Sequence, residues 1–417
     1  MRASLSIAAV ALSTLAVGCG GGDSGSGSFD LVIGNLIPLR GDLAQLGPAG
    51  RKSAALAAAG GRRAAARTGI EVALRSADTE TNDRIAEVRA RQLVEDGSAS
   101  CLVGDWASSG TFAVAGEVAV PEGVPLISPA STSFELTQLD DRGLLFRTVP
   151  SDDLQARALA KLAARSLGGA AGKKLSIGVR DDLYGRHFGA RLAAAWSRLG
   201  GRAQGPIRYD PGLLHHTADA RHIVAGRPDA FAIVDFPQSF ARLAPALLAT
   251  GRFRADRLFV PDVMAIDDAR DYDIPAAALD GARGTLPGAA APGPEGAYFD
   301  RLFAGSALQP ADQAGFDAQA FDAVDLCFLS AVAAGSADGE AIAGEVEAVS
   351  GPPGRRFGPD DLSAAVEALR AGDEIDYQGA SGPLDLDSAG DPTVGVYRTY
   401  RYRDGRMAVG GRIVSRR

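Results

Sequence analysis

The sequence contains little sulfur, with three cysteines and three methionines among its 417 residues. Cys19 lies in the N-terminal segment, which leaves Cys101 and Cys327 for the rest of the chain. Two cysteines could pair in an oxidising compartment, but nothing in the sequence brings these two together. Cys101 begins a predicted buried strand, and Cys327 lies on a predicted apolar helix face. We therefore expect two small buried hydrophobic residues, and a disulfide is the weaker alternative.

An excess of basic residues is also missing. The 43 lysines and arginines are outnumbered by 51 acidic residues, so the formal net charge is −8, and no basic stripe is present. This balance argues against a nucleic-acid partner. After the N-terminal segment, no apolar run reaches the length that a membrane-spanning helix needs. The apolar fraction of 46% and the charged fraction of 23% are typical of a globular protein.

Signatures of catalysis and of metal binding are absent or incomplete. No Gly-x-Ser-x-Gly elbow occurs. The glycine-rich segment 168–173 is one residue short of a phosphate-binding loop, Lys174 stands where Ser or Thr is required, and the segment precedes a predicted strand. His215, His216 and His222 lack a known metal-ligand spacing. We expect no enzymatic activity, no cofactor and no bound metal.

The N-terminal segment reads as an export signal. Arg2 supplies a positive start, an apolar run follows over residues 7–17, and small residues precede Cys19. The pattern resembles a bacterial lipoprotein signal over residues 1–19, in which Cys19 would carry the lipid. An ordinary signal peptide with an incidental cysteine is the alternative. Residues 20–29 are rich in Gly and Ser and are predicted to form a flexible linker. The expected location is the cell envelope, outside the cytoplasm, with a lipid anchor in the membrane.

Short β-rich runs alternate with helical stretches along the chain. Continuous apolar strands separated by helices predict parallel sheets that are covered on both faces. The pattern restarts near residue 150, so we predict an α/β protein with two doubly wound parallel-sheet lobes. The predicted strands are 31–37, 70–74, 101–104, 124–127, 175–179, 207–209, 230–234 and 258–260. The predicted helices among them include 47–59, 81–96 with Thr81 as a cap, 109–120, 152–166 and 185–199.

The pattern changes after residue 285. A loop rich in Ala, Pro and Gly covers residues 288–296. An alternating run at 394–402 predicts a strand that enters a turn at Asp404-Gly405. Residues 145–148 are the expected first crossing between the lobes. Further helices are predicted around residues 298–303, 316–334 and 362–370.

Loops at the carboxyl ends of the predicted strands are the candidate ligand site, because open parallel sheets bind ligands there. Ser108 and Ser109 follow one strand at the start of a helix. They could simply cap that helix, or the free N–H groups there could bind a small anion such as a carboxylate. Ala130, Ser131 and Thr132 follow the next strand and allow close backbone approach and short hydrogen bonds.

Two residues of the second series could face these loops. Asp262 follows the strand 258–260 and could pair with an ammonium group, or it could cap the following turn. Tyr184 lies at the mouth of the second lobe's sheet. Anion donors on one lobe and a cation acceptor on the other suit a zwitterionic solute.

Several longer motifs carry a family resemblance. The strongest run from Val103-Gly104-Asp105-Trp106 to Thr111 and from Gly123-Val124-Pro125 to Thr132. The others lie at residues 37–47, 77–79, 182–185, 321–324, 382–387 and 390–391. In order and spacing, the chain from about Asp30 to its end resembles type I periplasmic solute-binding proteins of the leucine/isoleucine/valine-binding group, which deliver solutes to ABC importers.

The resemblance implies a Venus-flytrap fold whose two lobes are joined by three crossovers. The lobes expected from it are 30–148 plus 286–376 and 149–285 plus 377–417. It places Ser108 on the ligand carboxylate, with backbone groups of Ala130 and the hydroxyl and backbone of Thr132. Tyr184 would line the cleft, and Asp262 would accept from the ligand ammonium.

Three positions depart from the pattern of that group. Leu46 stands where an aromatic residue often covers the ligand, Phe236 lies near a position that is often tyrosine, and Trp106 is bulky for a cleft loop. These residues put the ligand side chain in question more than the fold. The resemblance implies a monomeric receptor for an amino acid or a similar solute, with an ABC importer permease as its partner. A ligand-sensing lipoprotein of the same fold is the alternative.

Overall fold

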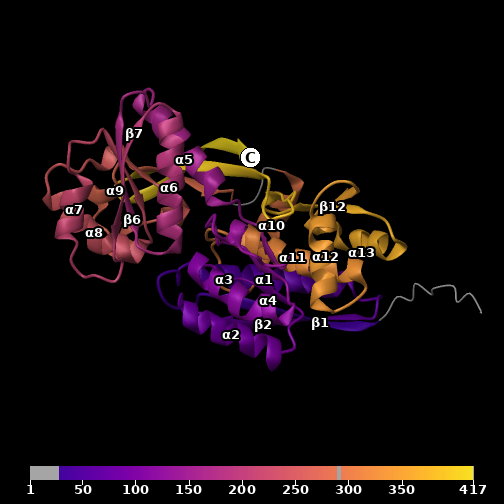
Figure 1. Cartoon of the computed structure of the whole chain (residues 1–417). Coiled ribbons are helices and arrows are strands. Elements are labelled where there is room, and N and C mark those ends of the chain that lie inside the picture. The colour runs from indigo at the N-terminus through magenta and orange to yellow at the C-terminus, as the bar shows by residue number, and fades with distance from the viewer. Residues whose placement is uncertain (1–27, 289–292, 417) are drawn as a thin grey trace, which may run out of the picture.

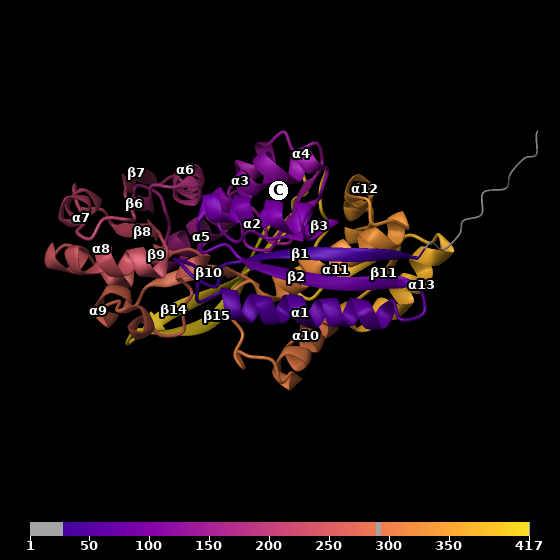
Figure 2. The same cartoon turned by 90° about the horizontal axis from the view of Figure 1, so that it is seen from below.

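The first lobe is built on a five-stranded sheet. The computed structural model describes residues 28–288 and 293–416. All neighbouring strands in this sheet are parallel, in the order β2-β1-β3-β4-β5. α1 covers one face and α2 and α3 the other (Figure 2). The strands are β1 (Phe29–Ile37), β2 (Ile70–Asp78), β3 (Cys101–Val103), β4 (Leu126–Ser128) and β5 (Leu145–Arg147), and the helices are α1 (Gly47–Ala64), α2 (Asp83–Glu95), α3 (Ser108–Val114) and α4 (Val120–Glu122).

The second lobe contains a seven-stranded sheet in the order β15-β14-β10-β9-β8-β6-β7. Alternate strand residues serve its two faces: Leu175 packs with α5 and α6, whereas Phe231 packs with α7 and α8. The strands are β6 (Lys174–Arg180), β7 (Arg202–Tyr209), β8 (Ala230–Val234), β9 (Leu258–Val260), β10 (Arg283–Pro287), β14 (Val394–Arg403) and β15 (Arg406–Arg416). The helices are α5 (Asp152–Leu167), α6 (Leu183–Arg198), α7 (Thr217–Ile223), α8 (Pro237–Ala249) and α9 (Ala276–Leu279).

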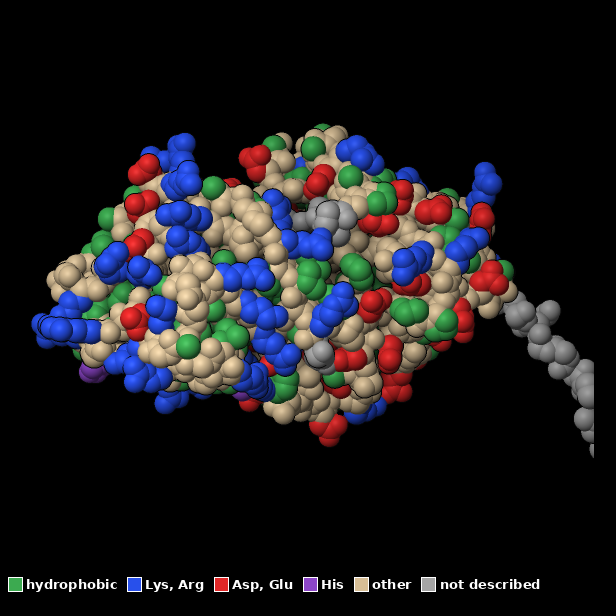
Figure 3. All heavy atoms as spheres, turned by 90° about the horizontal axis from the view of Figure 1, so that it is seen from above, with side chains coloured by type: hydrophobic (Ala, Val, Ile, Leu, Met, Phe, Trp, Pro, Cys, Tyr) green, Lys and Arg blue, Asp and Glu red, His purple; other side chains and the backbone are tan. Residues whose placement is uncertain are grey.

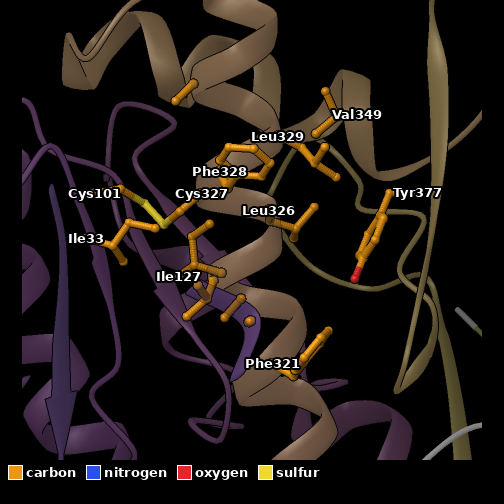
Figure 4. Close-up of a cluster of buried hydrophobic side chains, with 14 of the residues drawn as sticks. Ile33, Cys101, Ile127, Phe321, Leu326, Cys327, Phe328, Leu329, Val349 and Tyr377 are labelled. Carbon is orange, nitrogen blue, oxygen red and sulfur yellow. A yellow bond between two sulfur atoms is a disulfide. The ribbon is translucent and has the colours of Figure 1, made fainter. Parts of the chain in front are cut away.

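A third group of elements returns to the first lobe (Figure 1). α11 is buried along almost its whole length and joins the core of the first sheet. Residues from α12 and β12, such as Val349 and Tyr377, extend this core on the other side of α11 (Figure 4). The group comprises α10 (Pro294–Gly305), α11 (Asp317–Ala334), α12 (Gly339–Ser350), β11 (Arg355–Phe357), α13 (Leu362–Ala371), β12 (Ile375–Gly379) and β13 (Gly382–Pro383).

A disulfide between Cys101 and Cys327 joins β3 to α11 (Figure 4). Both residues are fully buried, as the sequence predicted. The expectation that they stay unpaired is wrong. Periodicity shows that each residue is buried, but it does not show that α11, 226 residues further along the chain, packs against β3.

Three crossovers connect the lobes, and two side chains tie them together. Thr148 follows β5 and donates from its hydroxyl to the carbonyl oxygen of Gln319, at 2.8 Å. The Gln319 amide in turn donates to the carbonyl of Gly288 in the second crossover, at 3.0 Å. The second sheet keeps β10 as far as Pro287, and β13 still pairs with β12 of the first lobe. The predicted lobe bounds at residues 286 and 377 stay predictions.

Buried Arg147 links the first crossover to the third. Its Nε donates to the Asp391 carboxylate at 2.6 Å, and its Nη1 donates to the Ser133 carbonyl at 2.8 Å. Thr137 bridges the same pair, because it accepts from Arg147 and donates to Asp391. Arg147 and Asp391 are 1% exposed, so this ion pair lies in a low-dielectric environment.

The predicted two-lobed α/β fold is confirmed, and each predicted strand overlaps an observed one, although β7 already begins at Arg202 and β2 continues to Asp78. Helix starts shift by one or two residues at α2, α3 and α6. Asn82, not Thr81, caps α2 by accepting from the Ile85 N–H. The helix predicted over 109–120 contains a wider π-helical turn at Ala115–Ala119, just before Pro121, which has no N–H to donate. α12, β11 to β13 and β15 were not predicted.

The N-terminal predictions fall largely outside the described residues. Cys19, the signal at 1–19 and nearly all of the linker at 20–29 lie there, and the last linker residue, Phe29, already belongs to β1. Within the described ranges, no helix taken alone is long and apolar enough to cross a membrane. α11 and α12 reach that standard only as a pair, with a bend of 108° between them.

Candidate functional site

The loop after β3 forms part of the site in the first lobe. Gly104 has φ +121°, and a Cβ there would lie 2.4 Å from the Leu36 carbonyl oxygen, so glycine is required. The carbonyl oxygen of Asp105 accepts from the hydroxyls of Thr111 and Ser128, at 3.0 and 2.7 Å. These bonds hold the loops after β3 and β4 together.

The Asp105 carboxylate is fully buried beneath this loop. Its Oδ1 accepts from the Thr79 hydroxyl at 2.9 Å. Burial raises the pKa of Asp105 to about 6, against the opposing effect of hydrogen bonds from Trp106 and Thr79. The buried Asp105 side chain thus belongs to the interior of the lobe beneath the loop.

Ser108 and Thr132 form the polar side of the site. Ser108 is the first residue of α3, and its Oγ accepts from the Ser133 N–H at 3.2 Å. Its hydroxyl proton therefore remains available to donate to an anion. The Thr132 carbonyl accepts from the Asp152 N–H at 2.7 Å, which links the loop after β4 to the start of α5.

A small cavity lies between these loops and the second lobe. About 10 Å³ of it is open to the centre of a water molecule, which is room for about one water. Entry of any solute larger than water therefore requires the lobes to part. Its lining residues are Leu43, Leu46, Trp106, Ala107, Ser108, Ala130, Thr132, Tyr184, Phe236, Val263 and Phe316.

Aromatic residues of the second lobe close the cavity from the other side. Tyr184 stacks on Phe236 with ring centroids 5.6 Å apart. The Arg180 guanidinium carbon lies 3.6 Å from the centroid of the Phe236 ring, which makes a cation–π contact. Arg180 also pairs with Asp182 and lies 3.7 Å from Asp235, so its charge is well compensated.

Asp262 lies behind Tyr184. Its Oδ1 accepts from the Tyr184 hydroxyl at 3.0 Å and from the Val263 N–H at 2.8 Å. Burial raises the pKa of Asp262 to about 6, and the hydrogen bond from Tyr184 lowers it in part. Burial, with the charges of Asp262 and Asp152, raises the pKa of Tyr184 well above its usual value, so the phenol stays a donor.

The structure brings most of the predicted site residues together. Those that line the cavity are Leu46, Trp106, Ser108, Ala130, Thr132, Tyr184 and Phe236. Three others do not line it. The Ser109 hydroxyl donates to Asp83 at 2.7 Å, and Ser131 is bonded to Thr111 and to the Asp105 carbonyl. Asp262 reaches the cavity only through Tyr184 and its neighbour Val263.

Sequence reasoning missed Phe316. It precedes α11 with φ +69°, a conformation that is rare for a bulky residue, and its ring packs edge-on against Trp106 at 6.4 Å. The sequence shows only an apolar residue before a helix. It also missed Leu43, Ala107 and Val263, although each lies beside a predicted site residue.

Direct contacts between the lobes surround the cavity. Arg180 lies 3.4 Å from the Asp42 carboxylate, and the Gln238 amide donates to Gln45 at 3.2 Å. His187 Nε2 lies 2.8 Å from the Glu135 carboxylate. These contacts join the end of β6, α6 and α8 to loops of the first lobe.

The histidines of the second lobe do not form a metal site in the structure. Within residues 28–288 and 293–416, no three or more His, Cys, Asp or Glu side chains are grouped suitably for a metal ion. His216 instead contacts Asp219, 2.9 Å away.

The surface charge differs between the lobes. Figure 3 shows Lys and Arg side chains gathered over the second lobe, and Asp and Glu side chains more frequent over the first lobe, on the face in view. The negative net charge is thus spread unevenly over the face in view.

Comparisons with known proteins agree with this geometry. A family described as periplasmic binding protein matches residues 30–406. The chain is 28% identical over 371 residues to the chemotactic signal transduction system substrate-binding protein BasB of Halobacterium salinarum, covering 88% of this chain and 85% of that protein.

Solved structures of solute-binding proteins share the fold. The leucine-binding protein LivK of Thermotoga maritima superposes with a TM-score of 0.72 at 21% identity, over 92% of this chain and 98% of that one. LivJ of Streptococcus pneumoniae, in complex with isoleucine, gives 0.71 at 18% identity, over 93% and 100%. A solute-binding protein of R. palustris in complex with benzoate gives 0.68 at 19% identity, over 94% and 98%.

Proposed function

Because the chain belongs to the periplasmic binding protein family, we propose that it is an extracytoplasmic receptor that closes its lobes around an amino acid or a similar solute. It then delivers this solute to an ABC importer permease and catalyses no reaction. The cavity between the lobes supports the proposal most directly, because Ser108 and Thr132 line it from one side and Tyr184 from the other. Neutral donors on the first lobe suit a carboxylate, and the acid behind Tyr184 suits an ammonium group.

Thermal unfolding of the purified mature protein tests this proposal. A ligand that binds only the folded protein stabilises it by roughly 2.7 kcal/mol at about 100 times its Kd. The panel should hold amino acids, their amides, ureas and aromatic acids, with neutral sugars as the control. We expect amino acids or close analogues to raise Tm, while the sugars leave it unchanged. If no amino acid or organic acid raises Tm, the proposal is wrong.

Sensing is the second candidate function. It is favoured by the similarity to BasB, whose name assigns it to chemotactic signal transduction. Deleting the gene separates the two: a receptor for import supports uptake of radiolabelled ligand, whereas a sensor supports a response to the ligand without affecting uptake.

We also propose that Cys19 anchors the protein in the membrane through a lipid and that the receptor is a monomer. A Cys19→Ser variant should then move from the membrane fraction to the soluble fraction. Light scattering on the mature protein without its lipid should give the mass of one chain. A variant that stays with the membrane would point to an anchor other than Cys19.

A further inference from the structure

A groove with three arginines lies at one end of the first lobe, between the last turns of α1 and α13. Arg63 and Arg67 line it from one side and Arg370 from the other. Its volume of about 690 Å³ falls in the range of sites that hold small ligands. Its apolar walls come from Ala64, Val366 and Ala371. We call it the arginine groove.

The positive charge of the arginine groove is not neutralised by the fold. All three arginines are exposed, and in the part of the chain that the structure describes no carboxylate forms an ion pair with any of them. One acid, Glu367, also lines the groove. Arg370 uses one of its N–H donors on the Thr68 carbonyl, at 3.3 Å. Burial raises the pKa of Asp325, and the charge of Arg63 opposes this rise without an ion pair.

Helix ends explain only part of this charge. Arg63 and Arg370 lie in the last turns of α1 and α13, where a positive side chain interacts favourably with the helix dipole. Arg67 lies three residues beyond the end of α1, where that interaction has faded. A phosphate group in the groove would accept charge-assisted hydrogen bonds from guanidinium groups, which match its oxygens in geometry.

The arginine groove lies beside the point where the chain enters the fold. Ser28 lies against Gly69, because a Cβ on Gly69 would be 3.1 Å from the Cβ of Ser28. Phe29 then pairs with Ile70 as β1 begins. Thr68, which lines the groove, directly precedes this contact. Figure 2 shows α1, β1 and α13 meeting at this end of the first lobe, away from the second lobe.

The proposed lipid anchor would hold this end of the molecule close to the membrane. Ser28 is nine residues after Cys19. Even when fully extended, a chain of this length spans no more than about 32 Å. The start of β1 can therefore lie no further than that from a lipid on Cys19, and the arginine groove is next to it.

We propose that the arginine groove binds the phosphate headgroups of anionic lipids and thereby fixes the orientation of the first lobe on the membrane. The inference rests on the proposed anchor and goes beyond it, because a tether alone leaves the receptor free to turn. Each basic residue near an anionic lipid surface strengthens binding by about fivefold. With the first lobe held in this way, the second lobe is the one that moves when the cleft opens.

Vesicle binding by the mature protein without its lipid tests the inference, because this measurement does not depend on Cys19. Sedimentation with vesicles of equal parts phosphatidylglycerol and phosphatidylcholine should carry the protein down, and vesicles of phosphatidylcholine alone should not. Added salt should weaken the binding, because it screens exposed charges. The triple variant Arg63→Gln/Arg67→Gln/Arg370→Gln should weaken binding to the anionic vesicles by roughly 100-fold.

A matched variant separates the groove from the overall charge. Arg165→Gln/Arg198→Gln/Arg221→Gln removes the same charge from the last turns of α5, α6 and α7 in the second lobe. These arginines are exposed, and in the described chain they form no ion pair either. Both variants should keep the Tm of the unchanged protein, and the second-lobe variant should bind the anionic vesicles as the unchanged protein does.

Inorganic phosphate distinguishes a lipid surface from a soluble anion. Titration calorimetry with inorganic phosphate should give no saturable binding. If phosphate binds while the anionic vesicles do not, the groove is a site for a soluble anion, and the inference is wrong. It is also wrong if the unchanged protein ignores anionic vesicles, or if both triple variants weaken binding equally. None of these outcomes affects the proposed receptor function or the proposed anchor, which thermal unfolding and Cys19→Ser test separately.

Discussion

Ser108 is the residue whose role follows most directly from its surroundings. Its Oγ already accepts from the Ser133 N–H, so its proton can be donated to a ligand, and its side chain lines the cavity. The neighbouring Ser109 has the same chemistry, but its hydroxyl is held by Asp83 outside the cavity. The two adjacent serines thus differ in where their side chains lie: Ser108 lines the cavity, and Ser109 contacts Asp83.

Replacing Ser108 with Ala should weaken ligand binding by about 1.5–3 kcal/mol, because a hydrogen bond to the charged carboxylate is lost. Isothermal titration with the best ligand from the thermal panel measures the change. Ser109→Ala is the control and should leave affinity within the experimental error. Equal effects of the two variants would contradict the assignment of the carboxylate to Ser108.

Some residues of the candidate site could be predicted from the sequence, and others could not. Ser108, Thr132 and Tyr184 were predictable, because strand ends in parallel sheets meet at one edge. The burial of Asp152 beside Thr132 was not, because an acidic residue at the start of a helix is ordinary and its burial depends on packing between the lobes. For Asp262, the sequence left ammonium binding and turn capping open, and it could not show that Tyr184 would stand in front of it.

At the scale of elements, parallel strands were predicted more accurately than the parts that join them. Fully apolar runs such as β8 and β9 have the bounds that the sequence indicated, because strands buried on both faces are mostly apolar and the polar residues beside them mark their ends. β15 is exposed along most of its length, so it has little apolar periodicity from which a strand could be predicted. The disulfide and the Arg147–Asp391 pair are contacts over long sequence separations, which no local pattern encodes.

The disulfide between β3 and α11 should stabilise the first lobe. Closing a loop of this length restricts the unfolded chain, and reducing the bond should lower the free energy of unfolding by about 2–5 kcal/mol. Urea unfolding with and without a reductant measures the difference. A Cys101→Ala/Cys327→Ala double variant is the control and should not respond to the reductant. Two reactive thiols in the unreduced, unfolded protein would show that the bond does not form.

Arg147 should contribute strongly to the free energy of unfolding, although it does not line the cavity. Replacing it with Gln leaves the buried Asp391 without its guanidinium, and the free energy of unfolding should fall by about 3–5 kcal/mol. Arg147→Lys keeps the charge and loses the fork of donors, so we expect an intermediate loss. Urea unfolding provides the measurement. If Arg147→Gln is as stable as the unchanged protein, the pair does not hold the crossovers together.

At the scale of the whole molecule, buried acids should make stability depend on pH. Burial raises the pKa values of Asp105, Asp262 and Asp322 to about 6 and those of Asp152 and Asp317 to about 8. An unfolded aspartate titrates near 3.8. Between these values the folded chain binds more protons than the unfolded chain, so stability is highest on the acidic side and falls as pH rises.

We therefore expect Tm to fall as pH rises from about 4.5 to about 8. Each extra proton bound by the folded state changes the free energy of unfolding by about 1.4 kcal/mol per pH unit. Asp317→Asn should flatten the fall, because the amide oxygen can still accept from the Ala314 N–H without ionising. Calorimetric scans across this range provide the check. A Tm that climbs throughout the range would mean that the exposed, salt-bridged aspartates dominate.

The contacts Asp42–Arg180, Gln45–Gln238 and Glu135–His187 join the lobes through side chains that do not line the cavity. They are therefore indifferent to the chemical identity of the solute, and they should slow the departure of every solute by the same factor. These three contacts would then lengthen the residence time of every solute, while the residues that line the cavity set the rank order of affinity among solutes. Selectivity and release rate are separable in such a molecule, so one can change without disturbing the other.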